Sequence, residues 1–277
     1  MKYLIFGNGY IGNKFKDALG GEAVISGVDI ADYQAVKQEL AQQKPDAVIN
    51  CAGKTGKPNV DWCEDHKLET ISSNVAGPLT LLRACGEEGI YWAHVGSGCV
   101  YTGDNGGKGY SEDDAPNFFG SFYSRTKAWS ETMLKEFPVL QLRLRMPVDD
   151  TPGSRNLITK ITTYKKVIST PNSVSVLEDF LRASLVLIGK RSTGIYNMTN
   201  PGGITHAEIL DMYREIVDPF FAYEIFSLEE LGAVTKAGRS NCVLSSDKRE
   251  SAGAHMRPVR EALRATLQTY KANLHRV

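Results

Sequence analysis

Two groups of residues have the types and spacing needed for acid–base chemistry. Ser97 and Cys99 lie two positions apart in the segment VGSGCVY, which is typical of a buried strand running into a loop. Tyr123 and Lys127 lie four positions apart, so on a helix their side chains would share one face. A lysine ammonium beside a phenol favours the phenolate, which lets the tyrosine exchange a proton with a carbonyl or alcohol oxygen. The sequence therefore predicts proton transfer at such an oxygen.

The Tyr-x-x-x-Lys spacing occurs more than once, and position distinguishes the cases. The pair that starts at Tyr10 lies inside a glycine-rich turn, and the pair that starts at Tyr33 ends on a helix face expected to be solvated. Tyr123 begins a helix that follows the strands of the second half of the predicted sheet. It lies 26 residues after Ser97, the serine at the end of a predicted strand. We therefore assign the proton-transfer role to Tyr123 and Lys127.

The type of residue at Cys99 leaves two interpretations open. Free cysteine is among the most buried residue types, and most cysteines only pack. The position of Cys99 beside Ser97 favours a chemical role.

The odd number of cysteines, without a C-x-x-C pair, argues against a disulfide framework or a zinc site, so no metal is expected. We interpret the other cysteines as packing residues: Cys51, Cys63, Cys85 and Cys242.

A glycine-rich turn directly follows the first predicted strand and opens the first predicted helix. Its pattern is G-x-G-x-x-G, in which the glycines permit a tight turn and let backbone amides approach a pyrophosphate. In this strand–turn–helix context the pattern predicts a dinucleotide site. The predicted cofactor contacts in the turn are Gly7, Asn8, Gly9, Tyr10, Ile11 and Gly12.

Asp29 and its neighbour Ile30 follow the second predicted strand and are further candidates for cofactor contact. A carboxylate here could accept a hydrogen bond from a ribose hydroxyl, which would favour NAD over NADP. Alternatively, Asp29 and Asp32 only start the following helix, or Asp29 faces the adenine ring. The choice of cofactor stays open at this point.

Predicted strands alternate with helices through the first half of the chain, which indicates an α/β fold with a Rossmann-type, doubly wound parallel sheet. Residues 1–147 are expected to form this NAD(P)-binding domain. Residues 148–277 would form a smaller substrate-binding region, with residues 177–199 packing back on the sheet. Predicted strands cover residues 2–6, 23–28, 47–51, 91–95, 139–143 and 195–198. Predicted helices cover residues 11–19, 32–44, 67–87 (kinked at 77–78), 122–136, 156–164, 177–188, 205–217, 227–235 and 255–277.

The charge balance excludes several classes of partner. The 277 residues include 32 Lys and Arg and 32 Asp and Glu, so the net charge gives no attraction to nucleic acid or to an anionic membrane. The first apolar run is too short for a signal peptide, and no window resembles a membrane span. We therefore expect a cytoplasmic protein.

Longer segments resemble one family within the extended short-chain dehydrogenases, the bifunctional nucleotide-rhamnose synthase/epimerase-reductases, which are related to dTDP-4-dehydrorhamnose reductase. The segments are CAGKTGKPNVDWCE (51–64), PNFFGSFYSRTK (116–127), LRLRMP (142–147), RNLITKI (155–161), TPNSVSVLED (170–179), GIYNMTNPGGITHAEILDMYR (194–214) and RSN (239–241). The resemblance implies epimerisation at C3 and C5 of a UDP- or dTDP-linked 4-keto-6-deoxyglucose. Reduction at C4 by NADPH, or by NADH, then gives the β-L-rhamnose nucleotide.

The resemblance also implies a role for individual residues. Ser97, Tyr123 and Lys127 match the reductase set, and Cys99 and Lys160 match the pair used for epimerisation. Further implied cofactor contacts are Cys51, Ala52, Gly53, Thr55, Asn74, Met146 and also Tyr123 and Lys127 themselves. The predicted substrate contacts are Asn59, Asn117, Phe118, Arg155, Asn172 and Arg239. Arg155 and Arg239, with Arg145, are candidates for the diphosphate because arginine forks suit phosphate oxygens, although each could equally be a surface charge. A homodimer and a separate 4,6-dehydratase that supplies the substrate are also implied.

Three departures from the family pattern keep alternatives open. The glycine turn is one residue shorter, the loop from Tyr101 to Pro116 is shorter, and an arginine is absent around Val28 and Asp29. NADPH is the expected cofactor, with NADH as an alternative. The alternative functions are a 4-reductase alone, another nucleotide-sugar epimerase, or a non-catalytic regulatory subunit that binds a dinucleotide.

Overall fold

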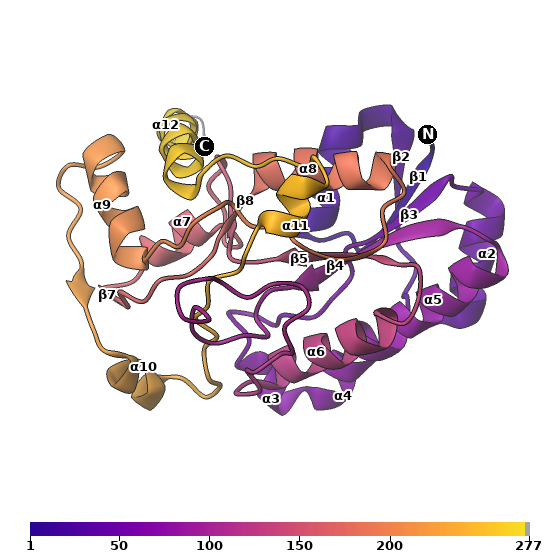
Figure 1. The fold of residues 1–277 in the computed structure, drawn as a ribbon, viewed down its shortest axis with the longest axis horizontal. Helices are drawn as coiled ribbons and strands as arrows, with labels where there is room; N and C mark the ends of the chain where they lie inside the picture. Colours follow the sequence, from indigo (N-terminus) through magenta and orange to yellow (C-terminus); the bar gives the residue numbers. More distant parts are fainter. Residues whose placement is uncertain (275–277) are drawn as a thin grey trace. The chain divides into compact units, whose positions relative to one another are not determined.

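A six-stranded sheet with the strand order β2-β1-β3-β4-β5-β9 organises the first part of the chain (Figure 1). The computed structural model describes residues 1–274. Strand β1 pairs in parallel with β2 and β3, and β3 pairs in parallel with β4. This sheet confirms the predicted α/β, Rossmann-type fold. The strands are β1 (Tyr3–Phe6), β2 (Ala23–Ser26), β3 (Ala47–Asn50), β4 (Tyr91–Ser97), β5 (Leu140–Leu144) and β9 (Gly194–Asn197).

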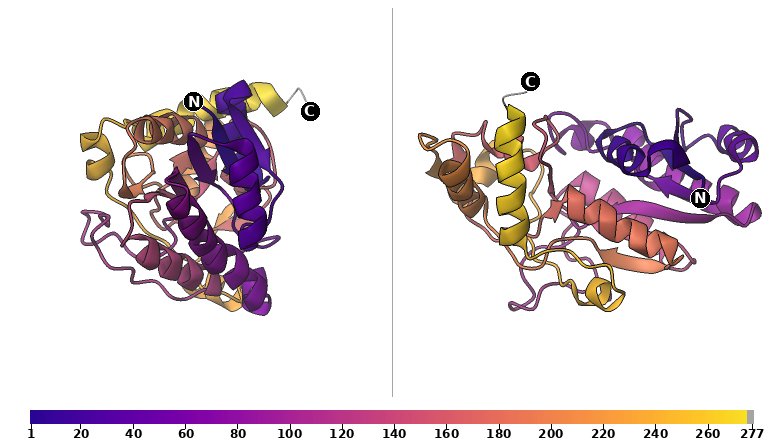
Figure 2. Two further views of the ribbon diagram at one scale, coloured as in Figure 1. Left: turned by 90° about the vertical axis from the view of Figure 1, so that its right-hand side faces the viewer. Right: turned by 90° about the horizontal axis from the view of Figure 1, so that it is seen from above.

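Helices cover both faces of this sheet because alternate residues of its strands point to opposite faces. Leu4, Phe6 and Val48 pack with apolar residues of α2, α5 and α6 on one face. Helix α1 lies on the other face, as the views in Figures 1 and 2 agree. The bounds are α1 (Tyr10–Leu19), η1 (Gly20–Glu22), α2 (Tyr33–Gln43), α3 (Trp62–Asp65), α4 (Lys67–Ile71), η2 (Ser72–Ala76), α5 (Gly77–Glu87) and α6 (Phe122–Leu134).

The helix predicted over residues 67–87 is divided by a π-helical turn. The turn, η2, ends immediately before Gly77, so the break precedes the predicted kink at Gly77-Pro78. Gly77 also lies against Ile30, since a Cβ at this glycine would be 2.4 Å from the Ile30 side chain. Pro at the start of α5 has no amide hydrogen to lose there, which suits the first turn of a new helix segment.

The chain divides into two compact units that differ from the expected boundary after residue 147. The first unit contains Met1–Val100, Pro116–Arg143 and Leu187–Tyr196, and the second contains Tyr101–Ala115, Leu144–Val186 and the rest of the chain from Asn197. The loop 101–115 is therefore part of the second unit. Asn197 holds it there by donating to the carbonyl oxygen of Tyr110, while Glu112 accepts from the Asn197 amide.

The second unit has a core of its own, built mainly on α7, α9 and α12. Two pairs of very short strands, β6 with β8 and β7 with β10, connect its loops. The elements are β6 (Pro147–Val148), α7 (Leu157–Ile161), β7 (Lys166–Val167), β8 (Ser175–Val176), α8 (Leu177–Gly189), α9 (His206–Ile216), β10 (Glu224–Ile225), α10 (Leu228–Val234), α11 (Asp247–Ser251) and α12 (Val259–Leu274).

Helix α12 is amphipathic and corresponds to the helix predicted over residues 255–277. Val259, Leu263, Leu267 and Tyr270 are buried, and the basic residues of the helix lie on its wet face. One of these, Arg264, forms an ion pair with Glu215 of α9. Residues 275–277, at the end of the helix predicted over residues 255–277, lie outside the described residues.

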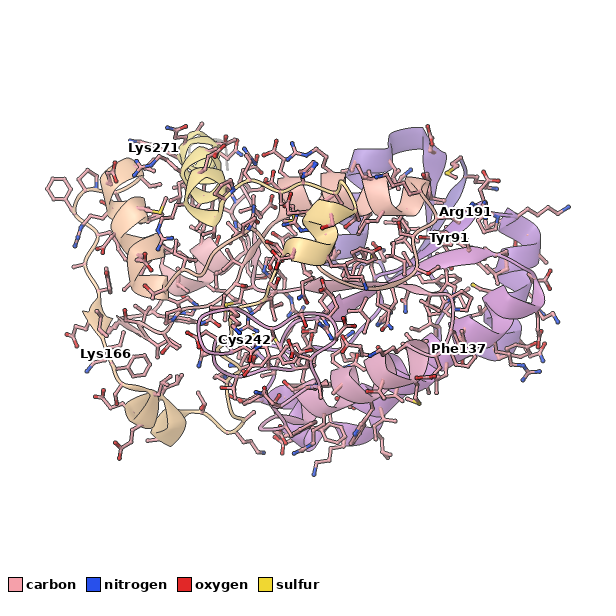
Figure 3. All side chains as sticks on the ribbon, in the orientation of Figure 1. Tyr91, Phe137, Lys166, Arg191, Cys242 and Lys271 are labelled. Carbon is pink, nitrogen blue, oxygen red and sulfur yellow. The ribbon has the colours of Figure 1, made fainter. Side chains whose placement is uncertain are left out.

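A side-chain contact between Tyr91 and Arg191 joins the start of β4 to the turn after α8 (Figure 3). The guanidinium lies 5.7 Å from the ring centroid, and the Tyr91 hydroxyl donates to the Ser192 carbonyl oxygen. Both contacts lie at the amino-terminal edge of the sheet, opposite the strand ends that carry the candidate site.

No helix between residues 1 and 274 combines the length and apolar character of a membrane span.

Candidate active site

The glycine turn packs tightly against the loop after β3. Gly7 has φ +101°, and a Cβ there would lie 2.5 Å from the Ala52 backbone nitrogen. A Cβ at Gly12 would lie 2.0 Å from the Gly7 carbonyl oxygen. At Gly9, which precedes α1 without a side-chain cap, a Cβ would meet no atom within 4 Å. The turn therefore leaves open space at the start of α1, as the approach of a pyrophosphate to the first amides requires.

Gly12→Ala is expected to disturb the glycine turn, whereas Gly9→Ala is not. The alanine methyl at position 12 would overlap the Gly7 carbonyl, and overpacking of this kind costs about 1–3 kcal/mol. At position 9 the methyl has room, but it would occupy the space left for a phosphate. We therefore expect a lower melting temperature for Gly12→Ala only, and weaker dinucleotide binding for both. Calorimetry and a fluorescence binding titration measure the two effects, and equal melting temperatures would contradict this account.

The structure shows the surroundings of Asp29 and Ile30, the two candidates for cofactor contact after β2. Asp29 is exposed, and one of its carboxylate oxygens accepts a hydrogen bond from the Ala31 amide. Asp32, rather than Asp29, caps α2 by accepting from the Ala35 amide. The side chain of Ile30 is buried in the core against Gly77. Asp29 is therefore placed at the carboxyl end of β2 with an acceptor oxygen on the surface, while Ile30 serves packing.

Buried polar side chains shape the loop that follows β3. Asn50 accepts a hydrogen bond from the Ala52 amide, and its side-chain nitrogen lies 3.0 Å from Nδ1 of His94 on β4. Burial, and then the charge of Lys127, keep the pKa of His94 well below its usual range, so its ring is neutral and Nδ1 can accept this bond. Asn50 therefore holds the backbone of this loop at Ala52, and His94 holds the Asn50 side chain.

The π-helical turn η2 places Asn74 beside the same loop. The Asn74 side chain accepts from the Lys54 amide at 2.8 Å and donates to the Lys54 carbonyl oxygen at 3.0 Å. It also donates to the hydroxyl of Thr126 on α6. A Cβ at Gly53 would lie 3.3 Å from the Asn74 oxygen and 3.5 Å from Nζ of Lys127. Gly53, Asn74 and Lys127 therefore converge, and any residue larger than glycine at position 53 would fill the space between them.

Helix α6 presents Tyr123 and Lys127 from a braced first turn. Ser121 caps the helix by accepting from the Ser124 amide, and the Glu64 carboxylate accepts from the Phe122 amide at 2.6 Å. A carboxylate at this end is stabilised by the positive end of the helix dipole. Tyr123 and Lys127 are both buried. Burial lowers the pKa of Lys127 to about 8, although the carboxylate of Glu131 opposes this shift.

The chain turns immediately after β4, so Ser97 and Cys99 do not share a strand face as extended geometry would require. They are instead joined by a hydrogen bond, in which the Cys99 amide donates to the Ser97 hydroxyl oxygen at 3.1 Å. The Ser97 hydroxyl keeps its own hydrogen for donation to a ligand. Both Asn117 and Phe118 donate backbone hydrogen bonds to the Val100 carbonyl, which holds their loop beside this turn.

In the second unit, Lys160 lies half-buried on α7. Burial, and then the positive charge of Arg155, lower the pKa of Lys160. Its amine therefore loses a proton more readily than that of a surface lysine, which suits a role in proton transfer. Without the family resemblance, nothing in the local sequence distinguishes Lys160 from a surface lysine.

Asn172 and Arg145, both predicted ligand contacts, lie in the interior of the second unit, and their ligand roles stay predictions. The Asn172 oxygen accepts from Arg145 and from the Cys242 amide, and its nitrogen donates to the Thr170 carbonyl and to the Asn241 side chain. These bonds use the full capacity of the amide. Arg145 is 1% exposed and also donates to Ser240.

The other predicted ligand contacts lie in loops or at the edge of a core. Asn59 accepts from the Asp61 amide at the start of α3, and Arg239 donates to the Ala237 carbonyl. Met146 belongs to the second unit, where it adopts φ +42° and packs at the edge of the core. Thr55 is half-buried in the loop after β3, and Asn8 is exposed in the glycine turn. The structure leaves the ligand roles of these residues as predictions.

Four residues that shape the site are absent from the sequence-based prediction. Asn50 and His94 are polar residues within apolar strand runs, a pattern that could have indicated them. Glu64 is the last residue of the motif PNVDWCE, but only the fold shows its contact with α6. Glu131 follows Lys127 by four positions, and its ion pair with a residue of β5 is likewise invisible in the sequence.

The chain is similar to known proteins over most of its length. The chain is 43% identical over 272 residues to a bifunctional dTDP-4-dehydrorhamnose 3,5-epimerase/dTDP-4-dehydrorhamnose reductase of Arabidopsis thaliana. The aligned residues cover 94% of this chain and 90% of that protein. It is 42% identical to a trifunctional UDP-glucose 4,6-dehydratase/UDP-4-keto-6-deoxy-D-glucose 3,5-epimerase/UDP-4-keto-L-rhamnose-reductase of the same plant, covering 95% of this chain but 41% of that protein.

Among solved structures, the UDP-rhamnose synthase of Acanthamoeba polyphaga mimivirus superimposes with a TM-score of 0.93 at 34% identity, covering 97% of this chain and 99% of that one. The family model described as RmlD substrate binding domain matches residues 1–272. Because this match extends over nearly the whole chain, the protein belongs to the RmlD substrate binding domain family.

Proposed function

We propose that the protein is a 3,5-epimerase/4-reductase that converts a UDP- or dTDP-linked 4-keto-6-deoxy-D-glucose into the β-L-rhamnose nucleotide. The observation that carries this proposal is the combination of Ser97, Tyr123 and Lys127 with Cys99 and Lys160 in one chain. The similarity to a bifunctional epimerase/reductase at 43% identity supports it. The sugar substrate would come from a separate 4,6-dehydratase.

The proposed cofactor is NADPH, with NADH as the alternative. Such a cofactor would supply a hydride for C4 of the sugar. The glycine turn would hold its pyrophosphate at the start of α1, where a Cβ at Gly9 would meet no other atom. Its other end would lie against the backbone at Gly53, close to Lys127. An exposed Asp29 carboxylate accepts a ribose hydroxyl more readily than a ribose phosphate, which keeps NADH as an alternative.

In the reduction, the chain would supply hydrogen-bond donors and a proton for the C4 oxygen. The hydroxyls of Ser97 and Tyr123 would donate to the ketone, and Tyr123 would release its proton as the alcohol forms. The Lys127 ammonium favours the resulting phenolate and so makes the proton easier to release. Asn74 holds the loop after β3 through Lys54, and Glu64 holds the start of α6 through the Phe122 amide.

In the epimerisation, the same donors would stabilise the enolate that forms when a proton leaves C3 or C5, since both carbons flank the C4 ketone. Inversion of each centre needs a base on one face and a proton donor on the other. We assign these roles to Cys99 and Lys160 as a pair. Burial, and then the charge of Arg155, lower the pKa of Lys160, so its amine loses a proton more readily than that of a surface lysine.

Incubation of the protein with UDP-4-keto-6-deoxyglucose and NADPH tests the proposal. The expected product is UDP-β-L-rhamnose without any added epimerase, identified by NMR. Turnover only after addition of a separate 3,5-epimerase would leave a 4-reductase alone. Tight NADPH binding without turnover of either the UDP or the dTDP sugar would leave a regulatory subunit. A panel of both sugars with both cofactors decides the nucleotide and cofactor preferences.

A homodimer formed through α5 and α6 is also proposed. The partly exposed aromatic side chains of Trp129 and Phe137 support it, because they lie on α6 and beside the apolar hollow between α5 and the start of β5. Light scattering after size exclusion measures the mass directly. Trp129→Glu should reduce a dimeric mass to that of a monomer, and an unchanged mass would place the interface elsewhere.

A further inference from the structure

A third ionisable residue continues the face of α6 that carries Tyr123 and Lys127. Tyr123, Lys127 and Glu131 follow one another at intervals of four positions, so their side chains lie along one side of the helix. All three are buried, with relative exposures of 8%, 6% and 7%. Glu131 therefore lies one turn beyond Lys127, inside the protein and away from the solvent that would screen its charge.

Glu131 is held by two charge-assisted hydrogen bonds from β5. Nε and Nη2 of Arg143 donate to its two carboxylate oxygens at 2.7 and 2.8 Å. The side chains of Arg143 and Glu131 are 1% and 8% exposed. A buried pair of this kind contributes little net stability, because both ions lose their hydration. Its bidentate geometry does, however, fix the position of the carboxylate.

Two of the other ionisable groups that face Lys127, His94 and Cys51, carry no negative charge near neutral pH because of their surroundings. His94 on β4 is neutral, since burial and the Lys127 charge lower its pKa. Burial raises the pKa of the Cys51 thiol at the end of β3, so this thiol stays protonated. Cys99, after β4, is the remaining thiol that faces Lys127. Within residues 1–274, Glu131 is thus the carboxylate that acts on the Lys127 ammonium.

We propose that Glu131, locked in place by Arg143, is a positioning residue that acts through Lys127 by favouring its ammonium form. Burial of this lysine favours the neutral amine, and the buried carboxylate one turn away opposes that effect. The consequence for ketone reduction rests on the proposed function. The effect on the charge of Lys127 does not, because it is a property of the protein without substrate.

The charge of Lys127 can be followed directly by NMR of protein labelled with ¹³C at the lysine Cε, with Lys127→Arg to assign the signal. The wild-type midpoint is expected near pH 8. In Glu131→Gln it should fall by at least about one pH unit, a tenfold loss of proton affinity. Glu136→Gln removes the same charge from an exposed position beyond the end of α6 and should leave the midpoint unchanged. Equal midpoints in the wild type and Glu131→Gln would overturn the proposal.

A second variant removes the effect of an unpaired Arg143. The double substitution Glu131→Gln/Arg143→Met takes away both charges and should also lower the midpoint, while Glu131→Asp should largely restore it. If the double variant kept the wild-type midpoint, the shift in Glu131→Gln would come from the unpaired charge of Arg143. The proposal would then be wrong. The double variant also serves if Glu131→Gln alone does not fold.

The pH profile of ketone reduction separates this inference from the proposed function. The wild-type kcat should fall as pH rises through about 8, because the Lys127 ammonium is then lost. In Glu131→Gln the same fall should begin at a lower pH, with KM for the sugar changed little. Absence of turnover in the wild type would contradict the proposed function. Turnover with an unshifted profile in the variant would contradict the role of Glu131.

Discussion

Tyr123→Phe is expected to reduce the rate of ketone reduction by about 10²–10⁴-fold, the usual contribution of a positioned general acid. The substitution removes one hydroxyl from a buried residue on the first turn of α6 and leaves the ring in place. Cofactor affinity should therefore change little, because the glycine turn and the loop after β3 are untouched. Single-turnover reduction of a pre-epimerised 4-keto sugar, followed by the loss of NADPH absorbance, measures the chemical step.

The chain offers a matched control for this experiment. Tyr33 is also followed by a lysine four positions later, but its hydroxyl contacts the exposed Glu87 on the outside of α5. Tyr33→Phe should therefore leave reduction unchanged. A similar loss of rate in both variants, or a full rate in Tyr123→Phe, would contradict the assignment of the proton-transfer role to Tyr123.

The sequence predicts most of the fold because its signals are local. The apolar strands and the glycine turn each lie within a few residues of chain, and the spacing of Tyr123 and Lys127 already indicates a shared helix face. The strands begin and end within about two residues of their predicted limits. Asp32 was also expected to cap a helix, and it does so.

The features that the sequence does not predict depend on contacts between distant segments. Glu64 meets the first amide of α6 across 58 residues. The Asn172 amide bonds to two distant segments, through Arg145 and through Asn241 and Cys242, besides its local bond to Thr170. The turn after Ser97 is likewise set by a hydrogen bond rather than by strand periodicity. The loop 101–115 joins the second unit through Asn197, which no local pattern indicates. Polar contacts of this kind need the folded backbone before they can be assigned.

Cys99→Ala is expected to abolish the incorporation of solvent deuterium at C3 and C5, with a loss of at least about 10²-fold, because one of the two groups needed for inversion is removed. Reduction of a pre-epimerised 4-keto-L-rhamnose nucleotide should continue, since Ser97, Tyr123 and Lys127 remain. Lys160→Met should give the same division between exchange and reduction. Incubation in D₂O without cofactor, followed by NMR of the sugar, measures exchange independently of hydride transfer.

The appropriate control is a thiol that the structure assigns to packing. Cys85 lies in the core on α5, and burial raises its pKa to about 12, so it stays protonated and out of reach of a sugar. Cys85→Ala should lower stability through the small cavity it creates while leaving deuterium exchange intact. Unchanged exchange in Cys99→Ala would remove Cys99 from the mechanism. Loss of reduction together with exchange would instead show that the turn between Ser97 and Cys99 had collapsed, because the Cys99 amide is the donor to the Ser97 hydroxyl. Only a loss of exchange with retained reduction distinguishes a two-step enzyme from a reductase.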